Sequence, residues 1–458
     1  MSTWTSNDGA LSWPDARVAR PTSPGVWMVA AYMVLFLVRP WEILLPQLQA
    51  LRFERVFAIT MIGVVLLTRR STRWASQSSA VIAVFLAAIL SAYRAWQGEL
   101  AWPQVYQYAT VVITYFLMRS VCRNWSDLMW LVLTYVGTMH LYLTKSLWEY
   151  FVHNRHVYAQ GVSRLTGIEV TYGEPNAVAM SAVVTLPLWL YLWRTRHGLS
   201  WAWQSTLRKA FGIGLITFPA AVFLAVGLTN SRAGMAALAA FIGGAMWLGV
   251  EQRKPIRLAV LACILIVGLF VVAPEAQRNR LRTLWNPDIG PANARESAGG
   301  RWQGFLAALD MVQARPLSGV GLGNFVAYRV SYLDGVGLLA HNLPGQLLGE
   351  MGWVGAVCFA WFLLVLWRNS RRLQQSTAGV FELRHFWQFA MMSQLTILLL
   401  LFFGLSLHNA LRYNWLWLAA FVTLASEFAA DELQQFDEDV MLPEDTSFRT
   451  HDVLAIYT

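Results

Sequence analysis

Long apolar stretches, each of about 17–25 residues, recur along most of this chain. A helix of that length crosses the roughly 30 Å hydrocarbon layer of a bilayer and satisfies its backbone hydrogen bonds internally. We count about twelve such stretches. Their centres fall near residues 35, 61, 86, 112, 139, 185, 219, 241, 265, 355, 397 and 421. The sequence therefore predicts an all-α polytopic membrane protein with about twelve transmembrane helices.

Composition excludes a soluble protein of ordinary design. Of the 458 residues, 56% are hydrophobic and only 13% are charged, and the mean hydropathy is +0.43. Many of the 23 tryptophans stand at the ends of apolar stretches, as expected for aromatic belts at the two membrane interfaces. The three cysteines are scattered and form no CxxC pair, so we expect neither a disulfide framework nor a cysteine metal site.

The distribution of basic residues predicts the orientation. If the N-terminus is cytoplasmic, the arginine-rich connections, such as 69–73 and 368–372, also fall inside, in agreement with the positive-inside rule. No removable signal peptide is expected, because the first 25 residues are polar and proline-rich. The predicted order is a cytoplasmic tail over 1–25, nine spans over 26–273, a periplasmic loop over 274–340, three spans over 341–430 and an acidic cytoplasmic tail over 431–458.

The last segment, 431–458, carries eight acids and one arginine, which predicts a disordered extension. Its "DED" at 437–439 resembles the metal-binding acids of nucleotide-sugar enzymes. Because these acids belong to a solvated run on the cytoplasmic side, we expect no metal there.

The connection 274–340 is too long for a simple turn, which is typical of a functional loop. It predicts an amphipathic helix over about 302–314, ended by Pro316, and a second short helix over 325–333. The apolar residues at helical spacing in the first are Trp302, Phe305, Leu306, Leu309 and Val312. We expect this helix to lie on the membrane surface or over a cavity.

Two arginines stand where polar groups are costly. Arg232 interrupts "GLTNSRAGMAALAAF" between two predicted spans, where it either aims into a wet cavity or snorkels to the interface. Arg301 follows two glycines at the start of the loop helix. A helix start with close backbone approach suits an anion such as phosphate, although a solvated arginine is an open alternative.

A third polar group opens the tenth predicted span in "AHNLPGQLLGEMGW". A helix from about Asn342 to Trp367 would be longer than the hydrocarbon layer is thick, so its first turns, with His341 and Glu350, emerge on the outer side. Gly345, Gly349, Gly352 and Gly355 form a small-residue stripe suited to close helix packing. His341 fits a structural or a catalytic role equally well, and His153, His156 and His408 are predicted on the same side.

Four motifs in this order resemble the O-antigen ligase and O-antigen polymerase superfamily. They are "TYGEPNAVAM", "LTNSRAG", "GGRWQGFLAALDMVQARPLSGVGLGNF" and "AHNLPGQLLGEMGWVGAV". The resemblance implies a GT-C-like glycosyltransferase of the bacterial inner membrane, which works at the periplasmic face without metal or nucleotide. It implies an undecaprenyl-diphosphate-linked oligosaccharide as donor and an acceptor glycan, with a chain-length regulator or export proteins as further partners and no nucleic acid.

The resemblance also implies roles for individual residues. Arg232 and Arg301 would bind the diphosphate, and His341 would act as, or beside, the base for the acceptor hydroxyl. The implied substrate-binding residues are Arg164, Asn176, Asn342 and Glu350. Of these, Glu350 lies two turns deeper and is expected to be structural or to support the site.

Three functions remain open on the sequence alone. A polysaccharide polymerase is favoured, because the acidic tail and "VRPWEILLPQL" are not typical of ligases that act on lipid A-core. A ligase that transfers the glycan to lipid A-core or to a protein is the alternative. A twelve-span transporter or flippase is the rival from another class, but it would place charges near mid-membrane in two corresponding halves, and no such correspondence is visible.

Overall fold

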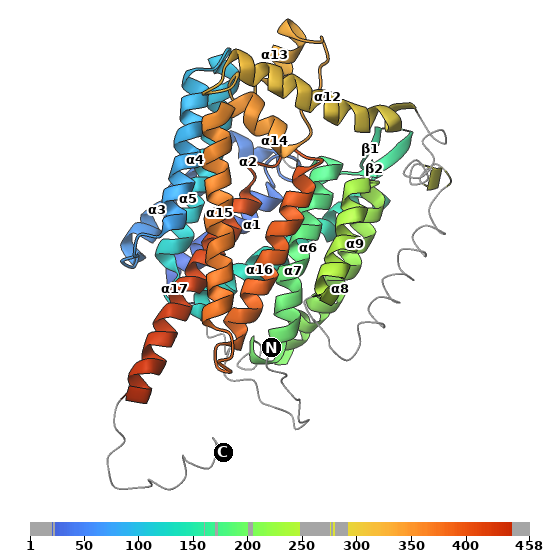
Figure 1. The fold of residues 1–458 in the computed structure, drawn as a ribbon. Helices are drawn as coiled ribbons and strands as arrows, with labels where there is room; N and C mark the ends of the chain where they lie inside the picture. Colours follow the sequence, from blue (N-terminus) through green and yellow to red (C-terminus); the bar gives the residue numbers. More distant parts are fainter. Residues whose placement is uncertain are drawn as a thin grey trace, which may run out of the picture.

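The computed structural model describes residues 23–159, 161–169, 173–199, 205–247 and 292–441, together with Pro21, Glu275, Arg278 and Asn279. Over these residues the protein is a helical bundle with one short hairpin (Figure 1). The first part comprises α1 Pro24–Val38, α2 Gln47–Ala50, α3 Phe53–Thr68, α4 Ser76–Tyr93, α5 Gly98–Val121, α6 Trp125–Val152, β1 His156–Ala159, β2 Val162–Leu165, α7 Pro175–Leu199, α8 Ser205–Thr229 and α9 Arg232–Trp247. The second comprises α12 Ala292–Ala314, α13 Phe325–Tyr332, α14 Leu343–Gln346, the π-helix η1 Leu347–Met351, α15 Gly352–Ser376, α16 Arg384–Gly404 and α17 Tyr413–Met441.

The predicted apolar stretches correspond closely to these helices. Eleven of the twelve centres fall on a helix, and the stretch near residue 265 lies outside the described residues. Among the described residues, five helical segments are long and apolar enough to cross a membrane, namely Ser76–Tyr93, Pro175–Arg196, Ser205–Thr229, Leu343–Ser376 and Arg384–Gly404. The chain is thus a helical membrane protein, while twelve spans and a GT-C architecture stay predictions.

The faces of α15 show what surrounds the bundle. Trp353, Val357 and Trp361 are exposed at intervals of four residues, whereas Phe359 and Phe362 on the opposite face are buried in the core. A continuous apolar face of this kind is unfavourable in water and stable against lipid. The helix therefore presents one face to the protein core and one to the membrane.

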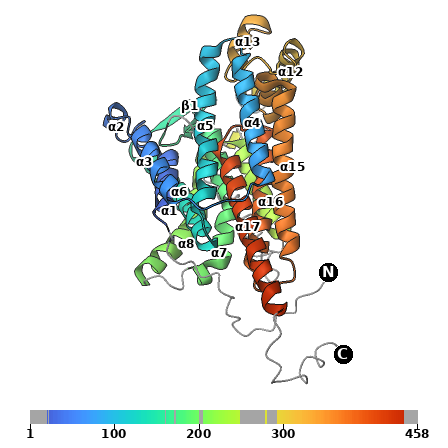
Figure 2. The ribbon, with the colours of Figure 1, turned by 90° about the vertical axis from the view of Figure 1, so that its left-hand side faces the viewer.

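The segment predicted as a loop between spans caps one end of the bundle. In Figures 1 and 2, α12 and α13 lie beyond the upper ends of α4, α5 and α15. This cap has a small core of its own, which contains Ala307, Ala308, Met311, Val320, Phe325 and Ala340. The helices predicted near 302–314 and 325–333 are both present, and α12 begins earlier, at Ala292.

Part of the predicted apolar stripe of α12 faces outward, away from the small core of the cap. Trp302 and Leu306 are exposed, whereas Ala307, Ala308 and Met311 are buried. Small residues face the protein because α12 approaches the chain closely: a Cβ on Gly304 would lie 2.9 Å from the Cα of Ala340. The large apolar side chains are left on the outer face, which suits contact with lipid.

The prediction of one continuous helix from Asn342 to Trp367 in the tenth span is wrong. The span consists of α14, η1 and α15, with a break at Gly352, whose φ is +63°. The cause is the preceding loop, because the N–H of Val320 donates to the carbonyl of Gly349 at 2.8 Å and the N–H of Trp353 donates to that of Pro316 at 2.8 Å. The small-residue stripe thus packs against the cap, where a Cβ on Gly349 would lie 2.8 Å from the Phe325 ring.

At the opposite end, α17 continues to Met441, so residues 431–441 are helical where a disordered tail was expected. In Figure 1 this part of α17 projects below the other helices.

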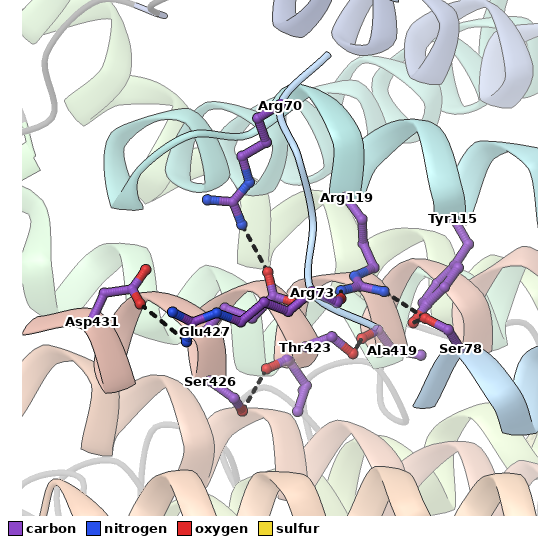
Figure 3. Close-up of polar contacts among 11 residues, drawn as sticks. Arg70, Arg73, Ser78, Tyr115, Arg119, Ala419, Thr423, Ser426, Glu427 and Asp431 are labelled. Atoms are coloured by element: carbon purple, nitrogen blue, oxygen red, sulfur yellow. Dashed lines mark hydrogen bonds and ion pairs between the residues drawn. The ribbon is translucent and has the colours of Figure 1, made fainter. Parts of the chain in front are cut away.

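An ionic cluster joins α17 to the bundle (Figure 3). Glu427 accepts hydrogen bonds from Arg70, at 2.7 Å, and from Arg119. The Arg119 side chain is only 3% exposed, so its charge depends on Glu427 for compensation.

We expect Glu427→Gln to lower the free energy of unfolding by about 2 kcal/mol, because the substitution leaves the buried Arg119 without its counter-charge. Unfolding in detergent would measure the loss. The matched control is Asp431→Asn, one turn further along α17 (Figure 3). Asp431 contacts the exposed Arg73 at 4.0 Å, and a solvated pair of this kind contributes less than about 1 kcal/mol. Equal losses in the two variants would contradict the buried-charge argument.

Candidate functional site

The hairpin and the helices beside it hold the first of the predicted site residues. Arg164, on β2, is buried. Its Nε donates to the carbonyl of Thr229 at 2.8 Å, and its Nη2 donates to Asn176 Oδ1 at 2.9 Å. Because Thr229 ends α8 and Asn176 lies in the first turn of α7, Arg164 joins three elements at the cap end of the bundle.

Arg232 is placed by the turn between α8 and α9. Asn230 adopts a left-handed φ of +50°, and its side chain donates to the carbonyl of Ser163 on β2 at 3.1 Å. The hydroxyl of Ser231 accepts from the N–H of Gly234 at 3.2 Å, which caps the start of α9. Arg232 therefore becomes the first residue of α9, beside the hairpin that carries Arg164.

Asn342 connects His341 to Arg301. Its Oδ1 accepts from the N–H of Gly345 at 2.7 Å and caps α14, while its Nδ2 donates to the carbonyl of Arg301 at 3.1 Å and to that of Ala340 at 2.8 Å. His341 stands between these anchored residues with a left-handed φ of +50°. Such backbone is uncommon for residues other than glycine and is maintained by surrounding contacts.

Electrostatic interactions show that the predicted residues lie together. Burial lowers the pKa of Arg301, and the positive charge of Arg232 lowers it further. Burial also lowers the pKa of His341, which Glu174 raises and Arg301 lowers. Arg232, Arg301, His341 and Glu174 form what we call the charged cluster. Its members come from α9, α12, the entry to α14 and the entry to α7.

Arg164 and Asn176 border the charged cluster. Burial lowers the pKa of Arg164, and the carboxylate of Glu174 raises it. The same carboxylate raises the pKa of His341. Glu174 belongs to the "TYGEPNAVAM" motif, but no role was predicted for it. The signal available was its position two residues before Asn176, at the start of α7.

Glu350 occupies a different position. Its Oε1 accepts from the N–H of Gly323 at 3.1 Å, and its carbonyl accepts from the hydroxyl of Ser91 at 2.7 Å and from the N–H of Gly321 at 3.1 Å. These bonds hold the glycine-rich turn of the cap against η1 and α4. The geometry favours the structural role expected for Glu350.

The charged cluster is suited to binding an anion and to accepting a proton. Two guanidinium groups that repel one another suit a dianionic ligand, because arginine binds phosphate oxygens bidentately and the anion removes the repulsion. An imidazole with a pKa below 6.5 is neutral near pH 7 and can accept a proton. Among the described residues, no group of three or more His, Cys, Asp or Glu side chains is placed to hold a metal ion.

We expect Asn342→Ala to destabilise the protein by about 1 kcal/mol through loss of the cap and also to slow the reaction at the charged cluster, because Arg301 and His341 lose their common anchor. The matched control is Asn124→Ala, which removes the cap of α6, where Asn124 Oδ1 accepts from Asp127 N–H at 3.0 Å. Thermal unfolding should show similar losses for both, and only Asn342→Ala should reduce turnover. Full activity of Asn342→Ala would contradict the anchoring role.

Comparison with known proteins gives one family match. Residues 216–360 match the family model described as O-antigen ligase. The match covers Arg232, Arg301, His341, Asn342 and Glu350. Arg164 and Asn176 precede it. No curated protein matches the chain.

Proposed function

We propose that this protein, which carries an O-antigen ligase domain over residues 216–360, transfers a glycan from undecaprenyl diphosphate to a sugar hydroxyl of an acceptor. Members of this family are glycosyltransferase-like enzymes. One observation carries the proposal: Arg232, Arg301 and His341, which are far apart in the sequence, interact electrostatically in one cluster at the cap end of the bundle.

The cluster matches the demands of the reaction. The acceptor oxygen forms a bond to the anomeric carbon, and the bond from that carbon to the diphosphate oxygen breaks, with its electron pair leaving on the diphosphate. Arg232 and Arg301 stabilise the negative charge that develops there. His341 takes the proton of the attacking hydroxyl. Charge stabilisation and proton transfer are thus assigned to different residues of this chain.

The position of the cluster suits a lipid-linked donor. It lies where the cap meets the membrane helices, so a polyprenyl tail can stay in the bilayer while the diphosphate and sugars reach Arg232 and Arg301. We place this end of the bundle in the periplasm of a bacterial inner membrane and both termini in the cytoplasm, because the arginine-rich connections then lie inside.

Within this reaction class we favour a polysaccharide polymerase, whose acceptor is another lipid-linked chain. An O-antigen ligase with lipid A-core as acceptor is the second candidate, favoured by the description of the matching family. A transporter is disfavoured, because the interacting charges belong to one end of the bundle and not to two corresponding halves.

Purified protein in lipid nanodiscs tests the proposal. We would supply an undecaprenyl diphosphate oligosaccharide in the presence of a metal chelator and no nucleotide, with and without lipid A-core. Longer lipid-linked chains would identify a polymerase, and product on lipid A-core would identify a ligase. No transfer to either acceptor, together with movement of the intact donor across the bilayer of a proteoliposome, would contradict the proposal.

A further inference from the structure

The turn between α16 and α17, residues 405–412, brings a second histidine to His341. The ring centroids of His341 and His408 lie 5.7 Å apart, with the planes tilted by 59°. One hydrogen bond joins the turn to α14, because the N–H of Ala410 donates to Gln346 Oε1 at 3.1 Å. The end of α16 also packs closely on α14, since a Cβ on Gly404 would lie 3.0 Å from Leu343 Cβ. The fold therefore sets the distance between the two imidazoles.

His408 has an unused polar atom. Its Nδ1 is buried and has no hydrogen-bond partner among the described residues. Leaving a buried polar atom unpaired costs free energy, and a ligand or water that completes the bond removes this cost. The same ring lies beside that of His341, a member of the charged cluster, so a ligand bound at the cluster would lie next to His408.

The two histidines differ in basicity. Burial, Arg412 and His341 lower the pKa of His408 to about 3, so this ring is neutral at physiological pH and is a very weak base. His341 has Glu174 beside it, which favours its protonated form against the opposing effects of burial and Arg301. A proton released between the two rings therefore goes to His341.

We propose that His408 binds the acceptor, by a hydrogen bond to the same sugar hydroxyl that His341 deprotonates. The inference rests on the proposed glycosyl transfer and adds an acceptor-binding residue to it. With ring centroids 5.7 Å apart, one oxygen atom can lie about 2.8 Å from a nitrogen of each ring. The hydroxyl donates its proton to His341 and accepts the N–H of His408. His408 itself gains and loses no proton.

The test compares His408→Phe, which keeps a ring without a polar atom, with His408→Gln, which keeps hydrogen bonding. At saturating donor, His408→Phe should raise the KM for the acceptor and lower kcat/KM by about 10–100-fold, the effect of one lost hydrogen bond to a buried group. His408→Gln should recover most of this loss. The acid limb of the pH profile, which belongs to His341, should stay unchanged in both. His153→Gln, at an exposed histidine paired with Glu149, is the control.

A readout independent of turnover separates this inference from the proposed reaction. In protein carrying ¹³C-labelled histidine, lipid A-core or a lipid-linked repeat unit should shift a ring resonance that is missing in His408→Gln. That shift would support the inference even if the wild-type protein transferred no glycan. An unshifted His408 resonance with both acceptors would overturn it. An acceptor KM in His408→Phe equal to that of the wild type would also overturn the inference. A loss confined to kcat, together with a displaced acid limb, would overturn it as well, because His408 would then act only through His341.

Discussion

Arg301→Ala should reduce kcat for glycan transfer by about 10²–10³-fold, the usual effect of removing one preorganised group that stabilises transition-state charge. The side chain is partly buried, and the nearby positive charge of Arg232 lowers its pKa. The structure therefore holds two guanidinium groups close together, and an anion bound between them would remove their repulsion. Arg301→Lys should recover part of the rate, because lysine keeps the charge but not the bidentate geometry.

The matched control for Arg301 is Arg315→Ala. Arg315 follows the same helix, and its guanidinium donates to the carbonyl of Arg94 at 2.7 Å. Transfer rates with a fluorescent lipid-linked oligosaccharide should separate the two variants by at least about tenfold. If both lost the same activity, the effect of Arg301 would arise from the cap as a whole and not from contact with the diphosphate.

His341→Ala should reduce kcat by between about 10² and 10⁴, the range for loss of a general base. The pH dependence follows from the direction of the shift. Because burial lowers the pKa of His341 below its ordinary value of 6.5, the base is neutral at pH 7, and the wild-type rate should decline only as the pH falls below about 6.5. His341→Ala should lose this acid limb together with the rate.

Initial rates measured from pH 5 to 8 check this prediction, with His156→Ala, on the exposed strand β1, as control. The wild-type midpoint should lie below 6.5, the ordinary value for histidine. A midpoint above it, or an acid limb that persists in His341→Ala, would show that another group accepts the proton.

Part of this site could be predicted from sequence, for reasons that particular residues make clear. Arg232 and Arg301 stand out because a charge beside an apolar stretch is energetically costly, which indicates a functional residue. His341 and Asn342 stand out because they precede a span. The structure places Arg301 within electrostatic range of both Arg232 and His341.

Other features depend on contacts between distant segments. His408 reaches His341 because the turn after α16 binds α14 through Ala410 and Gln346, and no periodicity in the sequence encodes that contact. The break at Gly352 likewise arises from hydrogen bonds to the preceding loop, which an apolar stretch cannot reveal. Glu427 could have been noticed as an acid near the last apolar stretch, but its partners on α5 and in the α3–α4 connection could not.

Binding of undecaprenyl diphosphate to the protein in nanodiscs tests the central claim most directly, because it needs neither acceptor nor turnover. Arg232→Ala and Arg301→Ala should each raise the Kd by roughly tenfold or more, the loss of a charge-assisted phosphate contact. His341→Ala, although slow in transfer, should bind like the wild type. Wild-type affinity in both arginine variants would contradict the assignment of the charged cluster as the diphosphate site.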